Sequence, residues 1–121
     1  MTGATRLIVG VEENKPDAVK HLRRELPAAD LLTLDGHTVH VRSRGAGEPL
    51  VLLHGFGGSA LTWARVEPEL ARGYRTVAID LNGFGWTERP GDPESYSLEG
   101  QERLVLSVLD ALGLERAHFA G

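Results

Sequence analysis

A short apolar run followed at once by a glycine-rich turn is the feature that most constrains this 121-residue chain. Residues 50–53 read Leu-Val-Leu-Leu, and residues 54–58 read His-Gly-Phe-Gly-Gly. An unbroken apolar run of this length favours a strand that is buried on both faces of a parallel sheet. The glycines allow the backbone to turn sharply or to come close to a bound group. Ser59 is a suitable N-cap for a helix that begins after the turn.

This order of apolar strand, glycine loop and helix start predicts a site for negative charge. The first N–H groups of a helix have no partner within the helix and lie at its positive end. Such donors stabilise phosphates and developing oxyanions. The residues alone therefore leave two ligands open at this loop: an anionic group that binds there, and an oxyanion that forms during a reaction.

Composition excludes several classes of function. The formal net charge is -4, with 13 Lys and Arg against 17 Asp and Glu, so the chain lacks the excess of basic residues that is typical of a nucleic-acid-binding protein. The chain has no cysteine, so disulfides and cysteine-based zinc or redox sites are excluded. The apolar stretch 7–11 is too short for a signal-peptide core or a membrane span. We expect no nucleic-acid partner, no membrane contact, no metal or other cofactor, and a cytoplasmic location.

Residues 1–30 are expected to form an N-terminal helical extension, which precedes a domain that spans residues 31–121. A helix can begin at Pro16, and Pro27 ends it. Packing of this extension on the body of the domain is the simpler interpretation. A role as an anchor or as a partner helix is the alternative.

The domain is predicted to begin with a β-hairpin. Asp35-Gly36 separates two strand-like runs, 31–34 and 37–43, in a pattern typical of a two-residue hairpin turn. The second run alternates polar and apolar residues, as a strand with one face in solvent does. We therefore expect an antiparallel edge with a solvent-facing second strand.

A parallel arrangement is expected after the first glycine loop. Ser59 should cap a short helix, which Pro68 interrupts within two or three turns. Residues 74–79 form the next apolar run, Ser97 can cap a longer helix, and residues 116–120 begin a third parallel strand. The predicted fold class is α/β, with an antiparallel hairpin joined to three parallel strands and crossover helices on the faces of the sheet.

A second glycine loop follows the 74–79 strand. It reads D-L-N-G-F-G-W-T at residues 80–87. The carboxyl ends of parallel strands meet at one edge of a sheet, where ligands of such folds bind. We therefore expect the two glycine loops to form one site.

A dinucleotide-binding site matches part of this pattern. Residues 55–60 fit G-x-G-x-x-G/A, and Asp80 follows about twenty residues later, as that fingerprint requires. Pro68 argues against it, because the helix beneath a pyrophosphate should run unbroken. The hairpin that precedes the first parallel strand and the glycine loop that opens at Asp80 also depart from the fingerprint.

Three motifs together resemble the N-terminal half of an α/β-hydrolase. They are H-G-F-G-G-S at 54–59, D-L-N-G-F-G-W-T at 80–87 and V-L-D-A-L-G-L-E-R-A-H-F-A-G at 108–121. Their order and spacing carry the resemblance, which covers residues 31–121. It implies a sheet with strand order 1-2-4-3-5, and an intact form that hydrolyses a small, largely apolar substrate by nucleophilic catalysis.

The resemblance also implies roles for the loop residues. In that family the residue after the H-G pair supplies a backbone N–H to the oxyanion hole, and by position this residue is Phe56. Phe56 and Trp86 are candidates to line the substrate pocket, and packing in the core is the alternative for Trp86. The remaining motif residues are expected to have structural roles: His54, Gly55, Gly57, Gly58, Asp80, Gly83 and Gly85.

The same resemblance places the catalytic triad beyond this chain. The nucleophile elbow of the family would begin near Gly121, and the acid and the base follow the nucleophile in chain order. None of the five histidines is then the catalytic base, and the 121 residues alone are expected to be inactive. The bond cleaved stays open among ester, lactone, epoxide, haloalkane and carbon-carbon bonds, as does the choice of Ser or Asp as nucleophile.

Several polar side chains have structural interpretations. His37 and His40 make a poor metal pair, because positions three apart on a strand face opposite sides. Both are expected to be surface histidines instead. His54 is expected to support its loop. Asp80 is expected to bond backbone N–H groups of the Asn82-Gly83 turn.

The strand at 116–120 is predicted to form an open, apolar edge of the sheet. We expect exposed apolar area there and a tendency to associate. The alternative to an enzyme is a non-enzymatic half-domain that pairs with a complementing chain, or an interaction module that reuses the fold.

Overall fold

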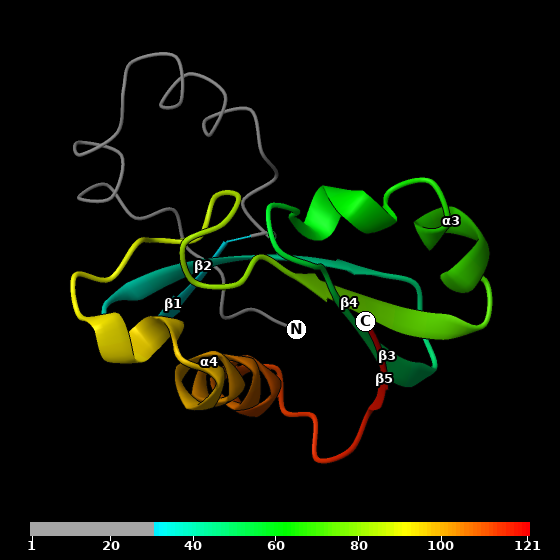
Figure 1. The fold of residues 1–121 in the computed structure, drawn as a ribbon. Coiled ribbons are helices and arrows are strands. Elements are labelled where there is room, and N and C mark those ends of the chain that lie inside the picture. The colour runs from blue at the N-terminus through cyan, green and yellow to red at the C-terminus, as the bar shows by residue number, and fades with distance from the viewer. Residues whose placement is uncertain (1–30) are drawn as a thin grey trace.

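The computed structural model describes residues 31–121, so the helical extension expected for residues 1–30 lies outside the described residues (Figure 1). The elements are, in chain order, β1 (Leu31–Leu34), β2 (His37–Arg44), β3 (Glu48–Leu53), the 3-10 helix η2 (Ala60–Trp63), α3 (Glu67–Leu70), β4 (Tyr74–Ile79), the 3-10 helix η3 (Pro93–Tyr96), α4 (Leu98–Ala111) and β5 (His118–Ala120). The longest helix, α4, has 14 residues, and no helix of this described part could cross a membrane.

The five strands form one sheet with the order β1-β2-β4-β3-β5. β1 pairs antiparallel with β2, and β2 pairs antiparallel with β4. β3 lies between β4 and β5 and runs parallel to both. The predicted strand order and the predicted combination of a hairpin with three parallel strands are therefore confirmed.

The hairpin turn has the predicted conformation. Asp35 and Gly36 have φ angles of 50° and 79°, and the register pairs Leu34 with His37 across the two-residue loop. Two consecutive positive φ angles are those of a type I′ turn, whose twist matches that of the flanking strands.

The prediction that β2 faces solvent on one side is wrong. Four consecutive residues of this strand, Thr38 to Val41, are buried. The register with β4 begins only at Val41, and the chain that follows β4 continues the contact, since Asp80 N–H donates to His40 C=O and Glu88 N–H donates to Thr38 C=O. Beyond the end of β4, the chain therefore continues to pair with the edge of β2, and the Asp80 carboxylate contacts the His40 side chain, which the alternating pattern assigned to solvent.

Helices cover both faces of the sheet. α4 lies on one face, and η2 and α3 lie on the other (Figure 1). The larger core cluster joins α4 to the strands and comprises Leu32, Val39, Val41, Val51, Val77, Ile79, Leu104, Val105, Val108 and Leu109. The smaller cluster joins η2 to the opposite face through Leu52, Ala60 and Ala78. Val51 and Leu52 of β3 are fully buried on opposite sides, as predicted for a two-sided strand.

The helix expected after Ser59 is replaced by two short pieces. Ser59 caps η2 through a capping box with Thr62, which confirms its predicted role as an N-cap. Pro68 does not interrupt a helix but lies in the first turn of α3, where a missing N–H costs nothing. Glu67, also in this turn, is buried and forms an ion pair with Arg42 of β2 at 2.6 Å. A buried carboxylate needs such a partner, so this pair attaches α3 to the sheet.

The last helix and strand follow the prediction closely. Ser97 accepts a hydrogen bond from the Gly100 N–H at the start of α4, and Gly113 has a φ of 72° just after its end. β5 begins at His118, two residues later than predicted, and it is an edge strand among the described residues.

Candidate functional site

The first glycine loop (residues 54–59) is a tight turn beyond the carboxyl end of β3. Gly58 N–H donates to Gly55 C=O at 3.0 Å, and Gly57 has a φ of 80°, which a side chain would disfavour. The turn carries Phe56 at its tip, with its side chain 99% exposed. Among residues 31–121, no hydrogen bond engages the Phe56 N–H.

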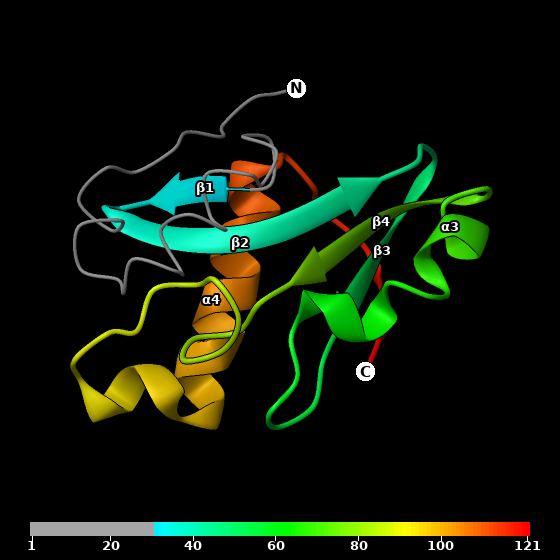
Figure 2. The ribbon, with the colours of Figure 1, turned by 90° about the horizontal axis from the view of Figure 1, so that it is seen from above.

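The second glycine loop (residues 80–87) lies beside the first. Leu53 and Ile79 are register partners at the ends of β3 and β4, so both loops leave the sheet at the same level. Seen from above, the two loops lie beyond the same end of the parallel strands β3 and β4 (Figure 2). The ring of Phe84 contacts the rings of His54 and Phe56 edge-on, at centroid distances of 5.3 and 5.7 Å.

His54 joins the two loops through both of its ring nitrogens. Nδ1 donates to Gly55 C=O at 2.8 Å, and Nε2 accepts from the Leu81 N–H at 3.1 Å. The Leu81 N–H can only donate, so Nε2 must be the unprotonated nitrogen of a neutral ring. His54 is buried, and both of its nitrogens bond backbone groups in this arrangement.

Asp80 is the centre of the polar network beneath the loops. Its Oδ1 accepts from the Ala60 N–H at 2.6 Å, and its Oδ2 accepts from the Trp86 N–H at 2.7 Å and from His40 Nδ1 at 2.9 Å. The carboxylate thus contacts the residue after the first loop and a residue of the second loop at the same time.

The predicted partners of Asp80 are wrong. The Asn82 N–H donates to Gln101 Oε1 of α4 at 3.0 Å, and the Gln101 amide returns a bond to Asn82 C=O at 3.1 Å. Because α4 packs against this turn, its backbone is satisfied by a residue about twenty positions later in the chain rather than by Asp80.

Burial raises the pKa of the Asp80 carboxyl, because it penalises the charged form. The hydrogen bonds from His40 and from the N–H groups of Ala60 and Trp86 stabilise that form and outweigh burial. The pKa of Asp80 therefore lies below the ordinary value of 3.8, and the group is an ionised acceptor at neutral pH.

The surface position predicted for His40 is also wrong. Its side chain is almost fully buried, and its Nε2 is a buried atom with no hydrogen-bond partner among the described residues. His37 lies near the surface and bonds Asn82 Oδ1 at 2.9 Å. Within residues 31–121, no group of three His, Asp or Glu side chains is arranged to hold a metal ion.

A second requirement for glycine lies at Gly85. A Cβ at this position would overlap the Asp80 carboxylate, and its φ of 54° is in the left-handed region. The neighbouring Trp86 has a half-buried side chain, and its backbone N–H is the Asp80 donor. Gly85 therefore lets the second loop close over the carboxylate.

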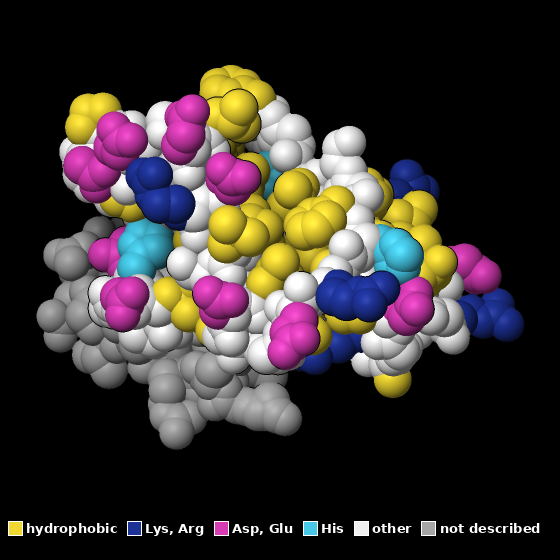
Figure 3. Space-filling model, turned by 90° about the horizontal axis from the view of Figure 1, so that it is seen from below, with side chains coloured by type: hydrophobic (Ala, Val, Ile, Leu, Met, Phe, Trp, Pro, Cys, Tyr) yellow, Lys and Arg dark blue, Asp and Glu magenta, His cyan; other side chains and the backbone are white. Residues whose placement is uncertain are grey.

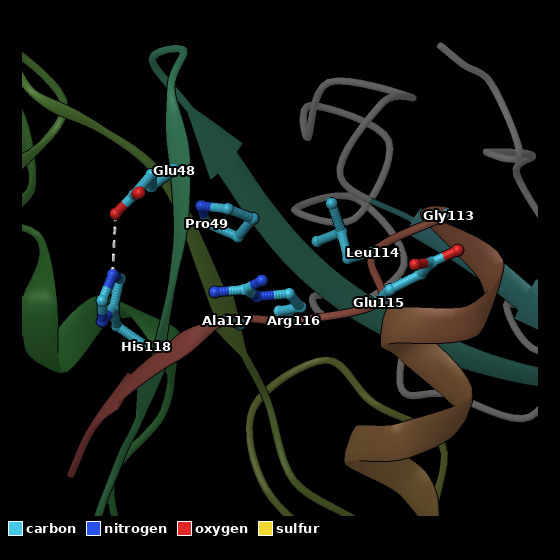
Figure 4. Close-up of a pocket in the computed structure, with 8 residues that line it drawn as sticks. All are labelled: Glu48, Pro49, Gly113, Leu114, Glu115, Arg116, Ala117 and His118. Carbon is cyan, nitrogen blue, oxygen red and sulfur yellow. Dashed lines mark hydrogen bonds and ion pairs between the residues drawn. The ribbon is translucent and has the colours of Figure 1, made fainter.

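A separate hollow of about 560 Å³ lies at the other end of the parallel strands (Figure 4). Glu48 and His118, which bond each other at 2.8 Å, line it together with Pro49 and residues 113–117. Glu48 and Pro49 are the first two residues of β3, so the four remaining residues of the strand, about 13 Å, separate this hollow from the first glycine loop. It is not part of the loop site.

We expect Gly85→Ala to lower the free energy of unfolding by at least about 2 kcal/mol, because it combines a strained φ with overlap on a buried charge. Gly91→Ala is the matched control, since a Cβ there meets no atom within 4 Å. The control should change the value by less than about 0.5 kcal/mol. Urea unfolding of both variants measures the difference, and equal stabilities would contradict the packing described for the second loop.

Asp80→Asn should lower stability at pH 7 by about 3 kcal/mol, because an amide cannot accept all three hydrogen bonds. It should also weaken the acid dependence. A folded-state pKa below the ordinary value of 3.8 contributes stability that is present above that value and is lost as the pH falls through the folded pKa.

Urea unfolding between pH 7 and pH 3 measures both effects. The wild-type chain should lose stability below about pH 4 more steeply than Asp80→Asn does. Asp110→Asn, which neutralises an exposed carboxylate on α4, controls for the change in net charge. The same acid slope in Asp80→Asn and in the wild type would show that this carboxylate is not held as described.

Comparisons with known proteins agree with this geometry. Residues 48–121 match the family model for the alpha/beta hydrolase fold. The chain is 37% identical over 111 residues to 2-hydroxymuconate semialdehyde hydrolase of Pseudomonas sp. (strain CF600), covering 89% of this chain and 37% of the relative. It is 38% identical over 87 residues to fluoroacetate dehalogenase of Burkholderia sp, covering 69% of this chain and 29% of the relative.

Solved structures show the same similarity. Epoxide hydrolase VrEH1 from Vigna radiata superposes with a TM-score of 0.68 at 32% identity, over 74% of this chain and 29% of that one. A meta-cleavage product hydrolase superposes with a TM-score of 0.70 at 34% identity, over 75% of this chain and 34% of that one. The chain thus spans between 29% and 37% of the length of these four proteins. The chain belongs to the α/β-hydrolase family, of which it carries the N-terminal part of the sheet with both glycine loops.

Proposed function

We propose that this chain supplies the oxyanion-hole side of a hydrolase site, with the backbone N–H of Phe56 as one donor. The observation that carries the proposal is a turn at the carboxyl end of β3 that is held by hydrogen bonds and whose tip presents an N–H that no described group uses. In α/β-hydrolases one oxyanion donor comes from the loop after this strand. Donors of this kind stabilise the negative charge that develops in the transition state.

The substrate is proposed to be small and largely apolar. Phe56 is exposed and contacts Phe84, so two aromatic rings border the donor. Trp86, in the second loop, is proposed to contribute to the same surface. Two of the relatives are named for hydrolysis of 2-hydroxymuconate semialdehyde and of epoxides, and a third is named for dehalogenation of fluoroacetate. These names support hydrolysis and leave ester, lactone, epoxide, haloalkane and carbon-carbon bonds as candidates.

The nucleophile, the acid and the base are not assigned to residues of this chain. Within residues 31–121, no histidine ring nitrogen bonds a serine or threonine hydroxyl, which is the contact that activates such a nucleophile. His54 bonds backbone groups with both nitrogens, and Ser59 accepts the Leu61 N–H as a cap. As the resemblance implies, we propose that the 121-residue polypeptide by itself is inactive.

The dinucleotide alternative is not proposed. The helix after the first glycine loop is a four-residue 3-10 helix, too short to direct a helix dipole at a pyrophosphate. The Asp80 carboxylate, which would bind a ribose hydroxyl, is buried and accepts three hydrogen bonds within the chain.

A chimera tests the proposed function. Residues 31–121 replace the corresponding segment of the Pseudomonas 2-hydroxymuconate semialdehyde hydrolase, and turnover of that substrate is measured. The chimera should be active, and Phe56→Pro, which removes the N–H, should lower kcat by about 100- to 1,000-fold. Phe56→Ala keeps the N–H and should stay within about tenfold of the parent chimera.

Two results would contradict the proposal. One is a folded chimera without turnover, and the other is equal activity of Phe56→Pro and Phe56→Ala. The 121-residue chain is assayed in parallel on p-nitrophenyl butyrate. Turnover above that of its own Phe56→Pro variant would overturn the proposed inactivity.

We also propose that the chain associates through the β5 edge, as the non-enzymatic alternative of a pairing half-domain would require. β5 pairs with β3 alone among the described strands, and Phe119 on it is 53% exposed. Hydrophobic side chains gather at the centre of the face that carries α4, with acidic side chains around them (Figure 3). Open apolar edges of this kind recruit further strands.

Light scattering coupled to size-exclusion chromatography measures this association. Phe119→Lys should shift the chain toward monomer, because a charge on an edge strand opposes pairing. Leu61→Lys is the matched control, since Leu61 is 55% exposed on η2, and it should leave the mass distribution unchanged. A monodisperse wild-type monomer with a cooperative melt would contradict the proposal.

A further inference from the structure

We propose that His40 and Asp80 are positioning residues for the Phe56 N–H: this buried pair, on β2 and at the end of β4, sets the geometry of the first glycine loop. The inference rests on the proposed function, because the Phe56 N–H is the donor proposed there. His40 and Asp80 touch neither the turn tip nor a substrate, so they would act on this donor through the loop. It concerns how the donor is held, which can be measured without any reaction.

The first glycine loop is tied to the second at both of its ends. At its start, His54 Nε2 accepts the Leu81 N–H at 3.1 Å. Just beyond its end, the Ala60 N–H donates to Asp80 Oδ1 at 2.6 Å. Phe56 lies between these two anchors, so the place of its N–H depends on residues 80 and 81.

His40 holds the carboxylate in the orientation that this anchor needs. Asp80 Oδ2 accepts from His40 Nδ1 and from the Trp86 N–H, which leaves Oδ1 directed at Ala60. Both side chains of the pair are at most 2% exposed, so no water can replace a lost donor without rearrangement. Without His40, Oδ2 loses one of its two donors, so the orientation of the carboxylate toward Ala60 is less firmly held.

The ring of His40 has this one polar contact among the described residues. Its Nε2 is buried without a partner, a cost that an aliphatic side chain of similar size would avoid. The backbone of His40 is also joined to the second loop, since its N–H donates to Thr87 Oγ1 at 3.0 Å and its C=O accepts the Asp80 N–H at 3.0 Å. An imidazole at this position is therefore explained by its bond to Asp80 rather than by its bulk.

The covalent structure of the side chains offers a matched pair of variants. In histidine Nδ1 is bonded to Cγ, and in asparagine the amide nitrogen is bonded to Cγ as well. His40→Asn can therefore keep a donor toward Asp80 Oδ2, whereas His40→Leu removes the donor and keeps apolar volume. A merely structural role for the ring predicts that Leu, the better core residue, is tolerated at least as well as Asn.

NMR relaxation of the 121-residue chain tests the inference directly. In the wild type the Phe56 N–H should have an order parameter near about 0.85, the value of rigid backbone. His40→Leu should lower it below about 0.6 and shift the Phe56 to Gly58 amide signals, and His40→Asn should leave both near the wild type. The amides of Val51 and Val77 in the sheet report whether the fold is kept.

Three results would overturn the inference. They are a Phe56 order parameter below about 0.6 in the wild type, an unchanged Phe56 amide in His40→Leu, and a His40→Asn variant that is no closer to the wild type than His40→Leu. The first needs no variant, so the inference stays open to refutation even if His40→Leu does not fold.

The chimera separates this inference from the proposed function. There, His40→Leu should lower kcat by at least about tenfold with KM within about threefold, because oxyanion stabilisation acts in the transition state, and His40→Asn should recover most of the loss. An ordered Phe56 N–H that depends on His40, in a chimera without turnover, would support the positioning and contradict the function. Turnover that depends on the Phe56 N–H but not on His40 would support the proposed function and contradict the positioning role of His40.

Discussion

The buried carboxylate of Asp80 is the interaction on which the site end of this fold depends. Three donors from three different segments converge on it: the ring of His40, the N–H of Ala60 and the N–H of Trp86. A charge removed from water is tolerated only when its oxygens are satisfied, so the segments that supply these donors must adopt one arrangement together. The position of both glycine loops follows from that requirement.

The sheet explains why these segments meet. Because β3 and β4 are parallel and in register, the chain leaves both strands at the same edge, and each exit needs room for a sharp turn. Gly57 provides the positive φ of the first turn, and Gly85 leaves space for the Asp80 oxygens under the second. The glycines thus serve two purposes: they expose a backbone N–H at the tip of one loop, and they allow the other loop to close over a charge.

Much of the fold could be predicted because its signals are local. The Asp35-Gly36 turn, the Ser59 and Ser97 caps and the apolar run of β3 are each decided by a few neighbouring residues. The wrong predictions share a different cause, which is contact between segments that are far apart in the chain. Alternation in β2 predicts a solvent face, yet His40 is buried and bonds Asp80, which lies forty residues later in the segment after β4. The partners of Asp80 were missed for the same reason, since Ala60 lies twenty residues before it in the chain.

By itself, the sequence determined where the strands lie along the chain, the caps, and the two loops whose motifs resemble an α/β-hydrolase, because hydrophobic period and turn chemistry act over short distances. The strand order within the sheet was implied only by that resemblance. The tertiary structure decided which polar groups meet: that Asp80 binds His40 rather than the Asn82 turn, and that His54 joins two loops. A buried polar side chain must find a partner, but the choice depends on which segments the packed sheet brings within about 3 Å, and no local pattern encodes that proximity.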